Sequence, residues 1–556
     1  MRVSARIARR ATPLVTEILY TVAALLAIVG AVAWIAARLH LPPPILLVVA
    51  GIALALMPWV PSITLQPDVV LLVLLPPLIY FAAFTMSWQA FRANLRPILL
   101  LAFGCVIVTT IAVAGAAHWL LGFPLGVAFM LGAIVSPPDV VAPLAVAERL
   151  SIPRRIIAVL EGEGLVNDAT ALILFNLALA AVFTGRFSLP EAAVDFALVL
   201  VTETAWGFVV GYVILRLRHL AAEPRLEVLL SLLTPFVAFW PPHALGGSGV
   251  LATVVSGLYV GSAGVALIRS NTRLQALFFW DVVNTVITGT IFLLTGLQAR
   301  TVAAGLDAAT LAHLVVNGML VSAVVIAVRF VWVFPATYVP RWLFPRIAAR
   351  DPAPNWRVPF VIAFTGVRGV VSLAAALSVP IAIAGDVAFP RRDAVLVLTF
   401  VVIVVTLVAQ GLTLPWVLTK LRLDKLGLAE VRRRKEREIY ARMEAARAAL
   451  AELDAAAKSH ALPVEVIAPW REREQLRIAQ LDGERERDGE RFAASASMHR
   501  LELALIAAQR KRLNELLRSG EVSDAIRRRV ERDLDLDEER LRGNLQGLAS
   551  SGEDAL

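Results

Sequence analysis

Long blocks of apolar residues fill the first 420 positions of this 556-residue chain. Hydrophobic residues make up 58% of the sequence and charged residues only 17%, whereas ordinary soluble proteins contain about 25% charged residues. A soluble globule cannot bury so much apolar surface, and the blocks have the length of membrane-spanning helices rather than of the alternating segments of a β-barrel. The sequence therefore predicts an all-α polytopic membrane protein, and it excludes a soluble enzyme or a DNA-binding regulator.

Thirteen of these blocks have the length of a transmembrane helix. We place them at residues 15–37, 43–60, 68–86, 97–121, 125–148, 152–183, 190–215, 226–241, 248–267, 274–299, 309–337, 357–384 and 393–419. Fifteen arginines lie in or beside the connections that follow odd-numbered helices, and four in those that follow even-numbered helices. Because positive charge marks cytoplasmic loops, the odd-numbered connections and the C-terminal region should face the cytosol.

The composition changes sharply near residue 420. Residues 421–556 contain 27 basic and 27 acidic residues, so the net charge of +9 belongs wholly to the membrane part, where cytoplasmic loops require it. We therefore predict a transmembrane domain at 1–420 and a cytosolic helical region at 421–556. That region is either a solvated helical bundle or a regulatory or dimerising tail.

The fifth block contains the motif Ser136-Pro137-Pro138-Asp139. Two consecutive prolines remove two backbone donors and disfavour helix at the preceding residue, so the helix should break here. Broken backbone at membrane depth is tolerated only where it is buried in protein or lines a cavity. The motif predicts a cation site that includes Asp139; the alternative is a simple proline kink.

The sixth block begins with a cluster of acidic residues and one amide. Glu163 and Asn167 are four positions apart and share a helix face, and Asp168 follows directly. A carboxylate beside an amide offers hard oxygen ligands for an alkali cation, and the carboxylate also binds a proton. We predict that Asp168 and Asn167 bind the cation and the proton. In the alternative, the span begins later and leaves Glu161 and Glu163 in water.

The twelfth block contains the motif Gly366-Val367-Arg368-Gly369. The two glycines predict a second broken helix, and a buried guanidinium there needs a carboxylate or exposed carbonyls. The alternative is an arginine that extends to the membrane interface. Two interrupted spans in separate halves of a chain are typical of a transporter site between two repeats.

Other polar residues in apolar blocks are weaker candidates. Asp281 and Asn284 either cap a helix or belong to a site, Arg329 is a structural partner or lies at an interface, and Glu203 is a relay or a packing hydrogen bond. Cys105 is the only cysteine, and the sequence contains no phosphate-binding loop. We therefore expect no cofactor and no ATP-driven pump.

The three motifs occur in an order that resembles a known family. The chain also contains Leu75-Pro76-Pro77-Leu78, Phe279-Trp280 and Gln410-Gly411-Leu412-Thr413. Over roughly residues 15–420 it resembles the monovalent cation/proton antiporters, the sodium/proton exchangers, and the adjacent Asn167 and Asp168 are similar to the electroneutral branch. The resemblance implies a homodimer in the bacterial cytoplasmic membrane, an inverted-repeat core with two crossed broken helices, and alternating access.

The resemblance also implies roles for individual residues. Asp168 would bind the ion, Asp139 would be the aspartate of the broken helix, and Glu163 and Arg368 would form a structural ion pair. The chain departs from many members at two positions, where Pro138 replaces a threonine and Gly164 a serine. Some members have an acidic residue at the position of Phe81. Fewer side-chain ligands would favour a larger ion such as potassium.

The expected function is secondary antiport of sodium, or of lithium or potassium, against protons across the plasma membrane, with a role in pH homeostasis. The expected partners are monovalent cations, protons and the lipid bilayer, and not nucleic acid. One alternative is a potassium/proton exchanger of the same fold, and another is a cation channel gated by the helical tail. A channel is disfavoured because the sequence contains no loop that resembles a selectivity filter.

Overall fold

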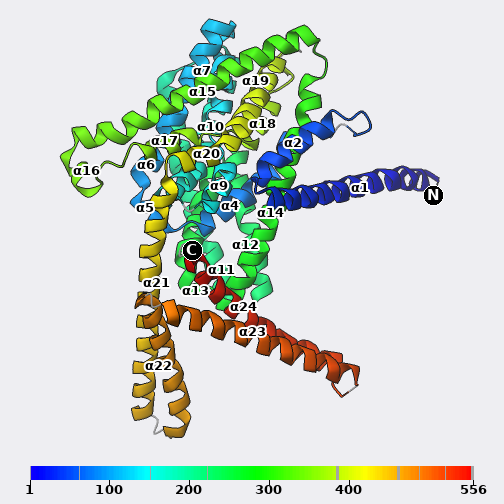
Figure 1. The fold of residues 1–556 in the computed structure, drawn as a ribbon. Helices are drawn as coiled ribbons and strands as arrows, with labels where there is room; N and C mark the ends of the chain where they lie inside the picture. The colour runs from blue at the N-terminus through cyan, green and yellow to red at the C-terminus, as the bar shows by residue number, and fades with distance from the viewer. Residues whose placement is uncertain are drawn as a thin grey trace. The chain divides into compact units, whose positions relative to one another are not determined.

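The computed structural model describes residues 2–61, 63–150, 152–221, 223–383, 387–459, 464–486, 489–519 and 521–552. The chain forms two compact units, Met1–Leu428 and Ala429–Leu556, and its described elements are helices apart from one small hairpin (Figure 1). The helices of the first unit are α1 (Arg2–Leu39), α2 (Pro43–Ala55), α3 (Pro67–Val69), α4 (Leu75–Thr85), α5 (Trp88–Ala93), α6 (Leu95–Leu99), α7 (Val106–Leu121), α8 (Leu125–Val135), α9 (Val141–Arg149), α10 (Arg154–Thr184), α11 (Leu189–Ala221), α12 (Pro224–Ala244), α13 (Val250–Leu267), α14 (Ser270–Ala303), α15 (Ala308–Leu343), α16 (Pro345–Arg350), α17 (Arg357–Phe364), α18 (Val370–Leu377), α19 (Arg392–Val404) and α20 (Gly411–Lys420). Three π-helical segments, η1 (Val70–Leu74), η2 (Leu100–Cys105) and η3 (Val405–Gln410), join neighbouring helices without a break.

Each of the thirteen predicted ranges overlaps one helical segment of the first unit. Among the described residues, eight continuous helices are long and apolar enough to cross a membrane, and α2, α8 and most of α13 are shorter apolar helices. The prediction of an all-α polytopic membrane protein is confirmed. The inverted repeat stays a prediction from the resemblance.

Two of the thirteen segments are interrupted near their middle. The first stops with α8 at Val135 and resumes with α9 at Val141, and the second stops with α17 at Phe364 and resumes with α18 at Val370. The four pieces have only 11, 9, 8 and 8 residues, whereas a continuous span needs about 20. Each interrupted pair therefore corresponds to one span of the prediction.

Two predicted helices end earlier than expected. Helix α2 ends at Ala55 rather than at residue 60, and Pro58 and Pro61 follow it. Helix α18 ends at Leu377 and is followed by the antiparallel strands β1 (Ala382–Ile383) and β2 (Val387–Ala388), so the predicted helix to residue 384 is wrong at its end. Proline provides no backbone donor for a continuing helix, and Pro380 accounts for this second stop.

The contacts among the helices of the first unit divide most of them into two groups. In the first helix group α2 packs on α14, α11 on α13, and α13 on α4, with α1 and α12 beside them. In the second helix group α8 packs on α7 and α10. Helix α15 packs on α7 and α19 (Figure 1). A core that includes Leu131, Val325 and Leu398 holds the second group together. Helices α9, α17, α18 and α20 also belong to the second group.

The second unit consists of helices α21 (Leu423–Ser459), whose first residues belong to the first unit, α22 (Val464–Glu486), α23 (Gly489–Arg518) and α24 (Asp524–Gly552). Ile439 and Met443 of α21 pack against Leu481 of α22. Arg510 of α23 forms ion pairs with Asp535 and Glu538 of α24. Since exposed ion pairs contribute little stability, the apolar contact between α21 and α22 contributes more than the ion pairs between α23 and α24.

Candidate cation and proton site

A cavity of about 580 Å³ lies between the two helix groups. The first group contributes wall residues from η1, α4 and α14, and the second group contributes them from the first break, α9, α10 and α18. The wall is mostly apolar. Its polar side chains are Thr85, Asp139, Glu161, Asp168, Asn284, Thr288 and Ser372.

The two broken segments bind each other directly. The backbone N–H of Asp139 donates to the carbonyl of Val367 at 2.6 Å, so a donor freed by one break meets an acceptor freed by the other. The Asp139 carboxylate accepts from the N–H of Val141 at 2.8 Å, at the start of α9. A negative charge is favourable at a helix N-terminus. These bonds fix Asp139 at the cavity wall.

Asn167 ties helix α10 to the first break. Its side chain is completely buried, and its amide nitrogen donates to the carbonyl of Pro138 at 2.6 Å. Asn167 is not among the residues that line the cavity, whereas the next residue, Asp168, is. The structure therefore brings Asp168 and Asp139 to one cavity and places Asn167 behind them.

Arg368 satisfies the carbonyls of both breaks. Its guanidinium is buried and donates to the carbonyls of Val135 at 2.9 Å, of Ser136 at 3.3 Å and of Gly366. Its backbone N–H donates to the hydroxyl of Thr406 in η3 at 2.9 Å. A helix end leaves its last carbonyls without intrahelical donors. Arg368 supplies those donors where α8 stops.

The predicted ion pair between Glu163 and Arg368 is wrong. Glu163 instead forms two hydrogen bonds with Arg329 of α15, at 2.5 and 2.7 Å, and both side chains are almost completely buried. Arg329 also donates to the carbonyl of Ile362 at 3.1 Å. The guanidinium of Arg368 already binds carbonyls of the breaks, and the carboxylate of Glu163 pairs with a different buried arginine, Arg329. Such bidentate pairs are the strongest hydrogen-bonded ion pairs in proteins.

The structure also decides several open alternatives. Helix α10 begins at Arg154 and Glu163 is buried, so the alternative with Glu163 in water is wrong. Glu203 accepts from the N–H groups of Ser248, Gly249 and Leu251 at 2.5, 2.9 and 3.1 Å. It therefore holds the N-terminus of α13 and acts in helix packing.

Asp281 and Asn284 do not cap a helix, because α14 begins at Ser270. Asn284 lines the cavity and Asp281 does not. Thr288 also lines the cavity and is a site residue that was not expected from the sequence. A signal was present, since Asn284 and Thr288 are four positions apart and share one face of an apolar helix.

The site offers carboxylate and hydroxyl oxygens in an otherwise apolar cavity. Within the described residues, no group of three or more His, Cys, Asp or Glu side chains is placed to hold a metal ion. A transition-metal site would require such a cluster. The arrangement fits a hard monovalent cation that is held by a few oxygens, and a proton on a carboxylate.

Comparison with known proteins identifies the family of this chain. The family model of the sodium/hydrogen exchanger transmembrane domain matches residues 22–420. The chain belongs to the sodium/hydrogen exchanger family. An uncharacterized sodium/proton exchanger of Mycobacterium tuberculosis is 33% identical over 516 residues, which cover 91% of this chain and 92% of the relative. That match includes part of the charged region beyond residue 420.

Two further matches are a relative in sequence and a solved structure. The sodium, potassium, lithium and rubidium/proton antiporter of Bacillus subtilis is 33% identical over 387 residues, which cover 67% of this chain and 57% of that protein. The solved structure of the sodium/proton antiporter of Methanocaldococcus jannaschii has a TM-score of 0.59 at 19% identity, and the match covers 72% of this chain and 98% of that one. The two proteins share a fold.

Proposed function

We propose that this exchanger is a secondary antiporter that moves sodium against protons, and that it is a transporter rather than an enzyme. The observation that carries the proposal is the pair of carboxylates, Asp139 and Asp168, on one cavity at the junction of two broken helices. Intramembrane carboxylates in such a position are costly and mark ion pathways. The freed helix ends around them are the usual place for a transported cation.

Asp168 is the carrier group in this proposal. One carboxylate cannot hold a cation and a proton together, so binding of one releases the other. This competition is sufficient to couple the flux of cations to the flux of protons. Asp139 provides a second oxygen ligand from the break. Asn167 positions the break through the Pro138 carbonyl. Exchange of one cation for one proton is electroneutral.

Alternating access follows from the placement of the site. Asp139 and Asp168 belong to the second helix group, whereas Asn284 and Thr288 belong to the first. Movement of the second group past the first carries the carboxylates from one side of the membrane to the other. We place the exchanger in the bacterial cytoplasmic membrane as a homodimer, with residues 1–420 for transport and 421–556 in the cytosol for regulation or dimerisation.

Potassium is a second candidate substrate because two positions lack a hydroxyl ligand. Pro138 has no side-chain oxygen, and its carbonyl already accepts from Asn167. A Cβ atom at Gly164 would lie 2.5 Å from the side chain of Val140, so a serine there would require Val140 to move. The Bacillus subtilis relative is named for four alkali cations, and fewer ligands favour a more easily dehydrated ion.

Reconstituted vesicles with an imposed pH gradient test the proposal. Addition of sodium should dissipate the gradient with saturation, and parallel additions of lithium and potassium rank the ions. Asp168→Asn should abolish exchange in a folded protein, because the amide cannot bind a proton. Asp195→Asn, an exposed carboxylate of α11 outside the cavity, is the matched control. Comparable exchange by Asp168→Asn contradicts the mechanism, and a non-saturating current would indicate the channel instead.

A further inference from the structure

A second pocket is lined by three arginines that pair with one carboxylate outside its wall. Arg96 of α6, Arg155 of α10 and Arg341 of α15 pair with Asp351, which follows α16, at nitrogen–oxygen distances of 2.8, 2.6 and 2.7 Å. Arg96 and Arg341 donate to Oδ2 and Arg155 donates to Oδ1. Among the described residues Asp351 is the one acid that pairs with them, so three guanidinium groups and one carboxylate leave two positive charges.

Two of these arginines retain donors for a ligand. The side chain of Arg155 is 42% exposed and that of Arg96 is 29% exposed, whereas Arg341 is 7% exposed. Arg341 also donates to the carbonyls of Asp351 and Thr337, which fix its position. A guanidinium has five N–H donors, and Arg96 and Arg155 each use one here. An anion can therefore bind without the loss of an existing ion pair.

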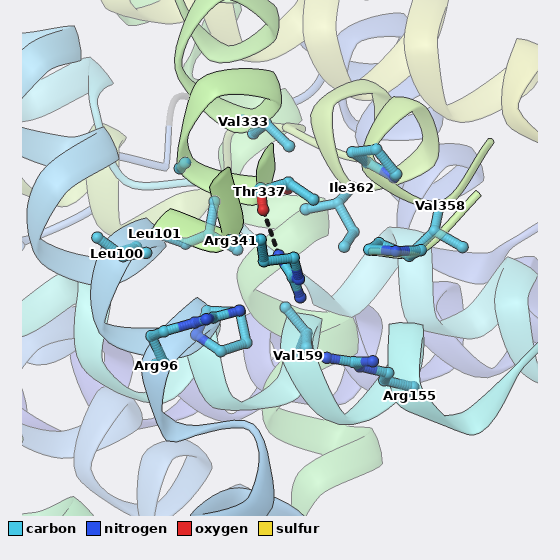
Figure 2. Close-up of a pocket in the computed structure, with 14 residues that line it drawn as sticks. Arg96, Leu100, Leu101, Arg155, Val159, Val333, Thr337, Arg341, Val358 and Ile362 are labelled. Atoms are coloured by element: carbon cyan, nitrogen blue, oxygen red, sulfur yellow. Dashed lines mark hydrogen bonds between the residues drawn. The ribbon is translucent and has the colours of Figure 1, made fainter. Parts of the chain in front are cut away.

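The rest of the pocket wall is apolar. In Figure 2, Arg96 and Arg155 lie along the lower edge, Arg341 lies between them, and Val333 and Ile362 lie above. Further apolar wall residues are Pro97, Leu100, Leu101, Val159 and Val358. A free inorganic anion gains nothing from such a wall. An amphiphile with an anionic head gains from both parts of the pocket.

Exposed aromatic side chains indicate the depth of the pocket in the membrane. Trp342 follows Arg341 directly, and Trp342, Phe344 and Trp356 are all more than half exposed. Tryptophan is enriched at the level of the lipid head groups, where its ring is partly apolar and partly wet. The arginines come from three connections that the charge pattern assigns to the cytosol. The cytoplasmic leaflet contains the anionic lipids.

The pocket is one helical turn away from the buried ion pair. Val159 is four residues before Glu163 on α10, and Val333 is four residues after Arg329 on α15. The wall residue Ile362 accepts from Arg329 through its carbonyl. A ligand in the pocket therefore contacts α10, α15 and α17, three helices of the second helix group.

We propose that this pocket binds the phosphate group of an anionic phospholipid from the cytoplasmic leaflet. Arg96 and Arg155 hold the phosphate, and the upper part of an acyl chain lies along the apolar wall. The bound lipid stabilises the cytosolic end of the second helix group. The proposal does not depend on which ion is exchanged, and its failure would leave the proposed function untouched.

Thermal unfolding of the delipidated, full-length protein tests the site. The probes are dioctanoyl phosphatidylglycerol, dioctanoyl phosphatidylcholine and inorganic phosphate at equal concentrations in a neutral detergent. Phosphatidylglycerol should raise Tm with saturation, and the other two probes should not. An equal rise of Tm with phosphatidylcholine would contradict the claim that the pocket recognises the negative charge of the head group. An equal rise of Tm with inorganic phosphate would contradict binding of a lipid and would indicate a site for a free anion.

Variants then locate the site. Arg155→Gln should weaken phosphatidylglycerol binding about fivefold, which corresponds to ~1 kcal/mol for one arginine near an anionic head group. Arg346→Gln removes the same charge from an exposed position of α16 outside the pocket and should bind as the wild type does. Asp351→Asn removes the negative charge beside the arginines, which repels an anionic head group, and should bind about fivefold more tightly. Equal weakening by both arginine variants, or no gain from Asp351→Asn, would overturn the proposal.

Discussion

The residues that most constrain this exchanger are buried charges, and Glu163 and Arg329 are the clearest pair. Removal of one partner leaves an uncompensated charge, so Glu163→Gln or Arg329→Met should each destabilise the protein by about 3–5 kcal/mol. The double variant Glu163→Met with Arg329→Met should recover most of that loss, because an apolar pair of similar volume needs no solvation. Thermal unfolding in detergent measures both effects.

A double-mutant cycle separates this pair from the one expected from the sequence. Coupling should be large between Glu163 and Arg329, since their hydrogen bonds are short and shielded from water. Arg368→Met should destabilise the protein by a different route, because it leaves the carbonyls of Val135 and Ser136 unsatisfied. Stronger coupling of Glu163 to Arg368 than to Arg329 would contradict the structure.

The ion pair of Glu163 shows which features of single residues can be predicted from one sequence and which cannot. Charged residues inside apolar blocks are recognisable, because burial of a charge is costly whatever its partner. The partner itself depends on three-dimensional packing, and Glu163 and Arg329 are 166 positions apart. Asp139 and Asp168 could be selected for the site from their local motifs alone.

At the scale of elements, the contact between the two broken segments depends on Gly369. A Cβ atom at this position would lie 1.9 Å from Oδ2 of Asp139, so no other residue fits without displacement of the carboxylate. Gly369→Ala should lower exchange about tenfold or more, because overpacking strain of about 1–3 kcal/mol acts directly on Asp139. Gly30→Ala in α1, where a Cβ meets nothing within 4 Å, is the control. Vesicle exchange assays compare the two, and equal rates would show that the breaks are not in contact.

The helices themselves could be predicted to a large extent. The length of the apolar blocks placed all thirteen segments, and the pair Pro137-Pro138 located the first break. Both signals are local in the sequence. The stops at Ala55 and Leu377 were missed although Pro58 and Pro380 follow them. The π-helical segment η3 was not predictable, since it places Thr406 against Arg368 and only the packed structure requires that bond.

At the scale of the whole transmembrane unit, the proposed alternating access requires that the two helix groups move relative to each other. The cavity between them already contains both carboxylates, and the buried Glu163–Arg329 pair and Arg368 hold the second group together as a body. Interfaces of this kind have discrete arrangements rather than continuous ones. Exchange is then the passage of a loaded second group between two such arrangements.

The proposed competition of cation and proton at Asp168 predicts a specific dependence of exchange on pH. As pH falls, protons occupy the carboxylate and exclude the cation, so exchange slows on the acid side; as pH rises, too few protons remain for the return step, so exchange slows again. Because the two ligands exclude each other, a tenfold higher cation concentration should move the acid limb about one pH unit lower once the cation is near saturation. Exchange measured from acidic to alkaline pH at two sodium concentrations provides the test.

A separate pH sensor in the charged C-terminal region would keep the acid limb of the exchange profile at one pH, whatever the sodium concentration. Truncation after Leu428, where the first compact unit ends, would then remove the pH dependence of exchange. An acid limb that moves with sodium in the full chain and in the truncated chain alike assigns the pH dependence to the carboxylate itself.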